Sequence, residues 1–262
     1  MTDLATTRSA LEQCYDAVEG LCTRMTVQDW QVQSLCPAWT ARGVVQHLTM
    51  MEQAMTGWVP ANTEELPHFE RVARADEEMG HLDDGAFAGL VSETFAGRRR
   101  DLAALTQEDM DRPSWTPVGV KTFGRFLEIR TFDFWVHARD ITTPLGWPTD
   151  DTGPAAEIAL AEVEGSLGYI VGKRVALPDG SGIVFHVTGP IKRDLAVVVD
   201  GRARVVDHLD NPDVEVTTDL LTFMQLACGR IDPQEQIDAG KITWTGNDEL
   251  GDRAARNLRF TI

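Results

Sequence analysis

The 262-residue chain has no long apolar run, few cysteines and little positive charge. No stretch of about 18 apolar residues occurs, so we expect no transmembrane helix. Its first residues, Met-Thr-Asp-Leu-Ala-Thr-Thr-Arg, show no charged segment followed by an apolar one, so we expect no signal peptide. The four cysteines include no C-x-x-C pair, and we expect reduced thiols in the core of a cytoplasmic protein.

Negative charge dominates the composition. The chain has 41 Asp and Glu residues against 24 Lys and Arg residues, a net charge of -17. Such a surface repels phosphate, so we expect no nucleic-acid or membrane partner. We expect a monomer or homodimer, but the charge itself indicates only solubility. The one tight basic run, Arg98-Arg99-Arg100, lies in a helical pattern, and we interpret it as a solvent-exposed helix face.

The spacing of apolar residues divides the chain into a helical part and a mixed part. It predicts four long helices, near residues 4–25, 40–55, 86–105 and 122–141, and a polar connector over residues 60–85. A Pro- and Gly-rich stretch over residues 144–154 is typical of a linker. Beyond it, helical patterns occur at residues 155–171, 218–227 and 248–258. The β-rich runs lie between them, at residues 182–188, 195–199, 203–206, 214–217 and 241–245. We therefore predict a two-domain α+β protein, with a four-helix bundle over residues 1–150 and a smaller α+β domain over residues 151–262.

The fourth predicted helix carries two polar stripes. At about 100° per residue, one stripe consists of Arg130, Asp133, His137 and Asp140. The other charged side chains lie on a roughly opposite stripe: Arg125, Glu128 and Arg139. A surface helix needs only one polar face, so we expect one stripe to face something polar inside the protein.

The residues of the first stripe have the chemistry of a metal site. Asp133 and His137 are spaced i, i+4, so both can reach one divalent ion; the alternative is an inward salt-bridge ladder that begins at Arg130. His47 lies on the core side of the second helix and is a third candidate ligand, or else a hydrogen-bonded core histidine. Three such ligands would leave open coordination positions, as catalytic sites do. We interpret the remaining histidines as surface or structural residues: His68, His81, His186 and His208.

Two sequence blocks carry a family resemblance. The first is Cys36-Pro-Ala-Trp-Thr-Ala-Arg-Gly-Val-Val-Gln-His47. The second is Arg130-Thr-Phe-Asp-Phe-Trp-Val-His-Ala-Arg-Asp-Ile141, which continues into Gly146-Trp-Pro148. Together they resemble the mycothiol-dependent maleylpyruvate isomerase family, whose members have a DinB-like metal-binding four-helix bundle. The segment after Gly182 is similar to the sterol-carrier-like domain that follows the bundle in these proteins.

The resemblance implies a cofactor, a cosubstrate and a set of site residues. It implies a divalent metal, usually zinc, held by His47, Asp133 and His137. It also implies that the open position receives the thiol of mycothiol, the low-molecular-weight thiol of actinobacteria, and that a small molecule is the substrate. The isomerase itself has Glu where this chain has Asp133, and the shorter acid shifts the metal on its helix. In the isomerase, an arginine of the C-terminal domain serves the substrate carboxylate, and the resemblance implies this role for Arg230. The alternative is that Arg230 is a cation at a helix C-terminus that pairs with the last carbonyl groups.

Three further residues are candidates for the same site. Arg130 is placed to orient Asp133. Glu52, five residues past His47, is a candidate proton-handling group, or else a solvated helix residue. Cys36 stands just before a helix N-terminus, where a thiolate is stabilised, so it is either a nucleophile or a small buried residue.

We therefore expect a metal-dependent enzyme that activates a thiol for isomerisation or S-transfer on a small electrophile. A thiolate can add to a conjugated cis double bond, which then rotates as a single bond and is restored as trans on elimination. Three alternatives remain open at this stage. They are a metal hydrolase that uses bound water, a carrier that binds an apolar ligand in the C-terminal domain, and a regulatory protein without turnover.

Overall fold

The computed structural model describes residues 3–260 and is an α+β protein, as predicted, with a helical N-terminal part and a sheet-containing C-terminal part. The chain divides into two compact units. The first comprises the residues up to Thr149 together with Gly153–Ile158, and the second comprises Asp150–Thr152 and the residues from Ala159 onward. Within residues 3–260, no helix is both long and apolar enough to span a bilayer.

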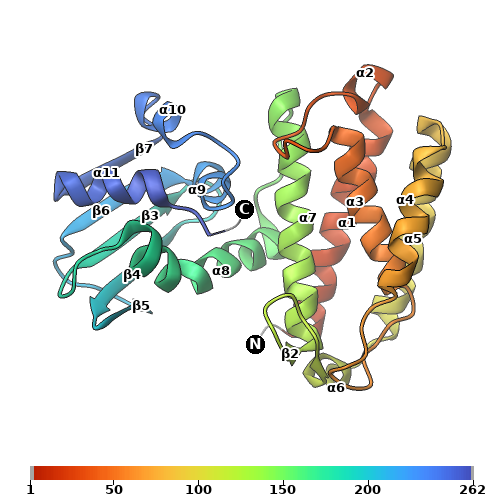
Figure 1. The fold of residues 1–262 in the computed structure, drawn as a ribbon, viewed down its shortest axis with the longest axis horizontal. Helices are drawn as coiled ribbons and strands as arrows, with labels where there is room; N and C mark the ends of the chain where they lie inside the picture. Colours follow the sequence, from red (N-terminus) through yellow and green to blue (C-terminus); the bar gives the residue numbers. More distant parts are fainter. Residues whose placement is uncertain (1–2, 261–262) are drawn as a thin grey trace. The chain divides into compact units, whose positions relative to one another are not determined.

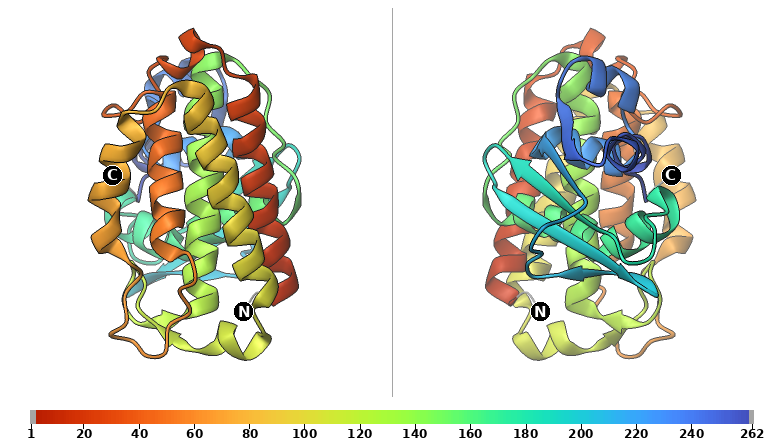
Figure 2. Two further views of the ribbon diagram at one scale, coloured as in Figure 1. Left: turned by 90° about the vertical axis from the view of Figure 1, so that its right-hand side faces the viewer. Right: turned by 90° about the vertical axis from the view of Figure 1, so that its left-hand side faces the viewer.

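A bundle of four long helices forms the first unit (Figures 1 and 2). They are α1 (Leu4–Arg24), α3 (Ala41–Met55), α5 (Asp84–Ala104) and α7 (Phe123–Leu145). Helices α1 and α3 each pack against both α5 and α7. Every one of the four begins at a side chain that accepts a hydrogen bond from the backbone N–H three residues on, and these caps are Asp3, Thr40, Asp83 and Thr122.

Aromatic rings fill the centre of the bundle. The ring of Tyr15 on α1 stacks on Phe95 of α5, with centroids 4.8 Å apart. It also meets Phe134 of α7 edge-on at 5.3 Å. All three side chains are fully buried, and burial of one such ring contributes about 1.5–3 kcal/mol. The apolar stripes predicted from the sequence thus form one core.

Short elements connect the long helices. They are α2 (Val27–Trp30), η1 (Phe69–Arg71), α4 (Val72–Gly80), α6 (Gln107–Asp111), β1 (Pro113–Ser114) and β2 (Lys121–Thr122). Helix α4 lies in the polar connector predicted over residues 60–85, and it packs on α3. Its buried residues, Ala75 and Met79, are four apart and make one short apolar face.

Helix α7 is longer than the sequence predicts. The expected linker begins at Pro144, but the helix continues to Leu145 and ends at Gly146, whose φ of 65° is the left-handed conformation that favours glycine. Pro144 has no N–H for the carbonyl of Asp140, four residues earlier. The N–H of Leu35 donates to that carbonyl instead, at 3.0 Å, so the proline leaves no backbone acceptor unpaired there.

A five-stranded sheet forms the second unit. Its strands are β3 (Gly182–Thr188), β4 (Arg193–Asp200), β5 (Arg202–Val206), β6 (Val214–Asp219) and β7 (Ile242–Gly246). Their order is β5-β4-β3-β6-β7, with β3 and β6 parallel and the other neighbours antiparallel. The unit's helical elements are α8 (Gly153–Tyr169, shared with the first unit), η2 (Ile170–Val175), α9 (Leu220–Ala227), α10 (Pro233–Asp238) and α11 (Asp248–Asn257).

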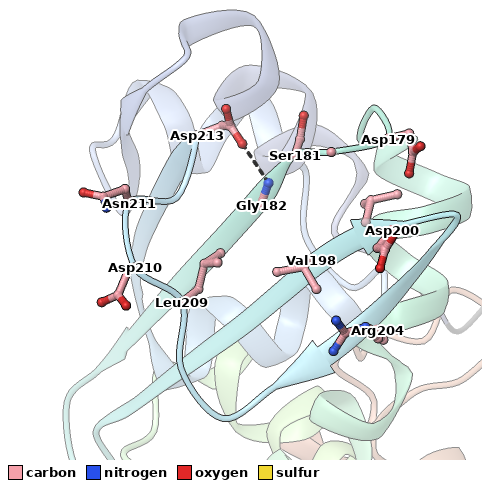
Figure 3. A pocket seen from close by; sticks show the side chains of 12 residues that line it. Asp179, Ser181, Gly182, Val198, Asp200, Arg204, Leu209, Asp210, Asn211 and Asp213 are labelled. Atoms are coloured by element: carbon pink, nitrogen blue, oxygen red, sulfur yellow. Dashed lines mark hydrogen bonds between the residues drawn. The ribbon is translucent and has the colours of Figure 1, made fainter.

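The two faces of this sheet differ because side chains alternate along each strand. Phe185 and its i±2 neighbours are buried, and the Phe185 ring meets Phe223 of α9 at 5.9 Å. His186 lies on the other face, in the lining of a small hollow to which Leu209 also contributes. There the segment between β5 and β6 places Leu209 over Gly182 (Figure 3). A Cβ at position 182 would lie 2.5 Å from Leu209 Cδ2, so a larger residue there would require the Leu209 side chain to move.

Candidate metal centre

Three side chains from two helices converge in the bundle. His47 comes from α3, and Asp133 and His137 come from α7. His47 Nε2 lies 3.6 Å from Asp133 Oδ2, and His137 Nε2 lies 3.4 Å from Asp133 Oδ1. One ligand atom from each residue can be chosen so that all three lie within 4.8 Å of one another. The structure thus brings together the three residues that the sequence suggests as metal ligands.

The donor set and spacing fit a divalent ion. Imidazole and carboxylate ligands suit zinc and its neighbours in the first transition series. Ligand bonds of about 2.0–2.2 Å in a tetrahedral site place neighbouring ligand atoms about 3.3–3.6 Å apart. The two His–Asp separations, 3.6 and 3.4 Å, fall in this range, each to a different oxygen of Asp133. The side chains of His47 and Asp133 are 20% and 28% exposed, so the group is open to solvent on one side. An open side is what a fourth, exchangeable ligand requires.

An aromatic side chain forms a wall of the site. The Trp39 ring stacks on His47, with centroids 4.8 Å apart and an interplanar angle of 21°, and lies 5.9 Å from the His137 ring. Gly43 permits this placement, because a Cβ there would lie 3.1 Å from Trp39 Cβ. Trp39 stands within the Cys36–His47 block that carries the resemblance, but no spacing or charge pattern in the sequence marks it as a site residue.

Arg130 controls the charge on Asp133. Its Nη1 donates to Asp133 Oδ2 at 2.5 Å. Burial alone would raise the pKa of Asp133, but the charges of Arg130 and His137 outweigh burial and hold that pKa well below its usual value. The salt-bridge ladder that we consider as the alternative therefore exists, and the same carboxylate also faces His47. The ladder keeps Asp133 ionised, which is the state that a metal ligand needs.

Glu52 is buried, which corrects its interpretation as a solvated helix residue. It is 1% exposed because cations and a hydroxyl surround it. Tyr15 Oη and Arg98 Nε donate to its Oε2 at 2.7 and 2.9 Å. Arg130 Nη2 donates to Oε1 at 3.1 Å. Both carboxylate oxygens thus accept hydrogen bonds from side chains of three other helices. Glu52 holds the Arg130 guanidinium in place through its ion pair with Nη2.

The basic run Arg98-Arg99-Arg100 is likewise not a uniform solvent-exposed face. Arg98 is 2% exposed because it pairs with Glu52, 46 residues away, and its Nη1 also donates to Asp101. Arg99 pairs with Asp16 and Glu19 of α1, and only Arg100 is exposed. The prediction is wrong for Arg98 because a buried cation on one helix is stable only when another helix supplies the anion.

Cys36 is buried, and its thiol is already engaged. Its Sγ donates to Asp140 Oδ2 at 3.1 Å and lies 3.7 Å from His137 Nδ1. The other cysteines, Cys14, Cys22 and Cys228, are buried thiols as expected. Burial raises the pKa of both Cys14 and Cys22 to about 12, so neither is a reactive thiolate at neutral pH.

Arg230 lies in the second unit, just beyond the end of α9. Its Nη1 donates to the carbonyl oxygen of Cys228 at 3.1 Å. That contact is the one expected of a cation at a helix C-terminus. A role of Arg230 toward the substrate carboxylate stays a prediction.

A hollow of about 440 Å³ lies on the outer face of the sheet in the second unit (Figure 3). Its lining includes four carboxylates, from Asp179, Asp200, Asp210 and Asp213, together with Arg204 and the apolar Val198, Val199 and Leu209. The Asp213 side chain accepts a hydrogen bond from Gly182 N–H at 2.8 Å. Such a lining favours water over an apolar ligand, so this hollow does not provide the site that a lipid carrier would need.

Comparisons with known proteins cover both units. Residues 11–142 match a family model described as the mycothiol maleylpyruvate isomerase N-terminal domain, and residues 157–253 match the model of the MDMPI C-terminal domain. Crystal structures of the mycothiol-dependent maleylpyruvate isomerase and of a histidine-to-alanine mutant of it resemble the whole chain. They are 16% and 17% identical to it, each with a TM-score of 0.61, and the matches cover 99% of this chain and 100% of theirs. At that identity the likeness shows a shared fold.

Other solved structures resemble only part of the chain, and a sterol carrier protein is an example. Sterol carrier protein 2 from Yarrowia lipolytica (apo form) is 15% identical, and the match covers 38% of this chain and 90% of that one with a TM-score of 0.28. A comparison with curated protein sequences finds no match.

Proposed function

Because the chain belongs to the mycothiol maleylpyruvate isomerase family, it is an enzyme, and we propose that it uses mycothiol and one divalent metal ion to isomerise a small electrophilic substrate. The observation that carries the proposal is the convergence of His47, Asp133 and His137 at ligand spacing on an open side of the bundle. Transfer of the thiol onto the substrate is the closely related reaction that the same residues would support.

The metal is proposed to be zinc, with His47, Asp133 and His137 as its protein ligands. A divalent ion held by these two imidazoles and one carboxylate would stabilise the thiolate of a bound thiol, whose ordinary pKa is about 8.5. In the proposed isomerisation the substrate loses a cis double bond on thiol addition, rotates about the resulting single bond and regains a trans double bond on elimination. The protein's task is therefore to hold the ligands and to orient the two reactants.

The chain's own residues support this task in three ways. Arg130 holds Asp133 ionised and oriented through its contact with Oδ2. Glu52 balances Arg130 and Arg98, so we assign it a positioning role in place of proton handling. The Trp39 ring keeps the His47 ring in place by stacking on it.

The proposal is tested by metal content and thiol dependence together. Purified protein should contain about one divalent ion per chain, and His47→Ala and His137→Ala should each lose it. His81→Ala is the matched control, because His81 is an exposed histidine of the same unit outside the ligand group. Isomerase activity on cis-unsaturated acids should require both the metal and mycothiol. Full metal content in either ligand variant would refute the site, and metal-dependent hydrolysis without thiol would refute the reaction.

A further inference from the structure

We propose that Asp140 is a positioning residue that selects which nitrogen of His137 faces the metal, with the Cys36 thiol as its supporting donor. The inference rests on the proposed metal centre and adds two residues to it. Asp140 and Cys36 are not among the three proposed ligands. Both lie near His137 Nδ1, whereas Asp133 lies near Nε2.

The two nitrogens of His137 face different carboxylates. Nε2 lies 3.4 Å from Asp133 Oδ1, on the side of the proposed ion. Nδ1 lies 2.8 Å from Asp140 Oδ2. As a metal ligand His137 must be neutral, with one N–H and one lone pair, and a carboxylate can only accept. Asp140 therefore favours the tautomer that is protonated on Nδ1, which leaves the lone pair of Nε2 directed at the metal position.

Asp140 can fix the ring because it is itself fixed. Its side chain is 1% exposed, and its Oδ2 accepts a second hydrogen bond, from Cys36 Sγ at 3.1 Å. Its backbone carbonyl accepts from Leu35 N–H, since Pro144 cannot supply the helical donor. Two hydrogen bonds thus connect residues 31–40, here called the 31–40 loop, to Asp140 of α7. Leu35 donates to its backbone and Cys36 donates to its side chain. The same loop carries Trp39, which stacks on His47.

A second metal position at Cys36, His137 Nδ1 and Asp140 is the competing interpretation of these contacts, because their ligand atoms also lie within 4.8 Å of one another. The distance between His137 Nδ1 and Asp140 Oδ2 decides against it. At 2.8 Å it is a hydrogen-bond length, and it is shorter than the roughly 3.3 Å between neighbouring ligand atoms of a tetrahedral ion. The thiol and the imidazole N–H are both donors to one carboxylate oxygen.

The direct experiment reads the tautomer in the unmodified protein. Long-range ¹H–¹⁵N NMR spectra of the zinc-loaded chain, assigned with His137→Gln, should show His137 protonated on Nδ1. A ring protonated on Nε2 would overturn the inference. The tautomer itself is read in the unmodified protein, and His137→Gln serves only to assign the signal.

The second experiment measures zinc affinity in Asp140→Asn by competition with a chromophoric chelator, at a temperature where the metal-free variant is folded. We expect a dissociation constant 10- to 100-fold higher than that of the unmodified chain. Asp84→Asn, which removes an acid paired with Arg42 elsewhere in the bundle, should leave the constant unchanged. An unchanged constant in Asp140→Asn would overturn the inference while the proposed metal centre stands. Failure of the unmodified chain to bind zinc would overturn both.

Cobalt substitution separates the two interpretations of Cys36. In the cobalt-loaded protein we expect no sulfur-to-metal charge-transfer band, and Cys36→Ala should keep the absorption spectrum with an affinity reduced less than in Asp140→Asn. A charge-transfer band that disappears in Cys36→Ala would show that the thiol is a ligand, and the positioning role would be wrong.

Discussion

The N–H of Leu35 donates to the carbonyl oxygen of Asp140 at 3.0 Å, across 105 residues of sequence. The bond exists because Pro144 leaves that carbonyl without its helical donor. A proline near the end of α7 therefore attaches the 31–40 loop, and with it Cys36 and Trp39, to the helix that carries two of the three proposed ligands.

Pro144→Ala should weaken this attachment. Alanine restores a helical N–H four residues after Asp140, which competes with Leu35 for the carbonyl. We expect amide hydrogen exchange in the 31–40 loop to become several-fold faster, while exchange in the centre of α7 stays unchanged. Hydrogen exchange followed by mass spectrometry would show it. Equal exchange of the loop in both proteins would mean that other contacts hold it.

Glu52→Gln should destabilise the protein strongly. The substitution leaves Arg98 and Arg130 buried with a neutral partner, and removal of one member of a buried ion pair costs about 3–5 kcal/mol. Chemical denaturation followed by circular dichroism would measure the free energy of unfolding. Glu78→Gln, which removes a surface partner of Arg74, is the control and should change it little. A Glu52→Gln protein as stable as the original would contradict the described network.

Trp39→Ala should weaken metal binding without unfolding the chain. The ring is only partly buried, and a stacked aromatic pair contributes about 0.5–1.5 kcal/mol, which corresponds to roughly 2- to 12-fold in the zinc dissociation constant. Trp39→Phe keeps a ring over His47 and should recover most of the loss. If alanine and phenylalanine behave alike, Trp39 does not hold His47 in place.

His186 should make the second unit more stable at low pH. Its Nδ1 lies 2.7 Å from Asp194 and its Nε2 lies 3.0 Å from Glu215, and Asp207 and His208 line the same small hollow. The hydrogen bond to Asp194, followed by that to Glu215, outweighs partial burial and raises the pKa of His186 above its ordinary 6.5. Its stabilising contribution is therefore complete below pH 6.5 and is lost as pH rises through the folded-state pKa.

The difference in Tm between the unmodified chain and His186→Gln checks this sign. It should be larger at about pH 5.5 than at about pH 8.5. His208→Gln is the control, because His208 is 80% exposed and pairs only with exposed Asp210 among its described contacts. A Tm difference that is the same at both pH values would show that His186 contributes only packing.

Local features of the site were predictable from the sequence. The i, i+4 spacing of Asp133 and His137 places both on one face of any helix, and the apolar neighbours of His47 turn it toward the core. The same periodicity predicts the four long helices, because it depends only on residues one or two turns apart. Pro144 misled the prediction of the end of α7, since the donor that compensates for it lies on a distant loop.

By itself, the sequence determined the long helices, the strands of the larger sheet and the inward direction of the three proposed metal ligands, because those follow from spacing within single elements. Only the tertiary structure decided which charges are buried and what they contact. Glu52 meets Arg98 and Arg130, and Asp140 meets Cys36, because separate helices and a loop bring them together. A buried charge is stable only beside a partner of opposite charge or a hydrogen-bond donor, and that partner stands far away in the chain.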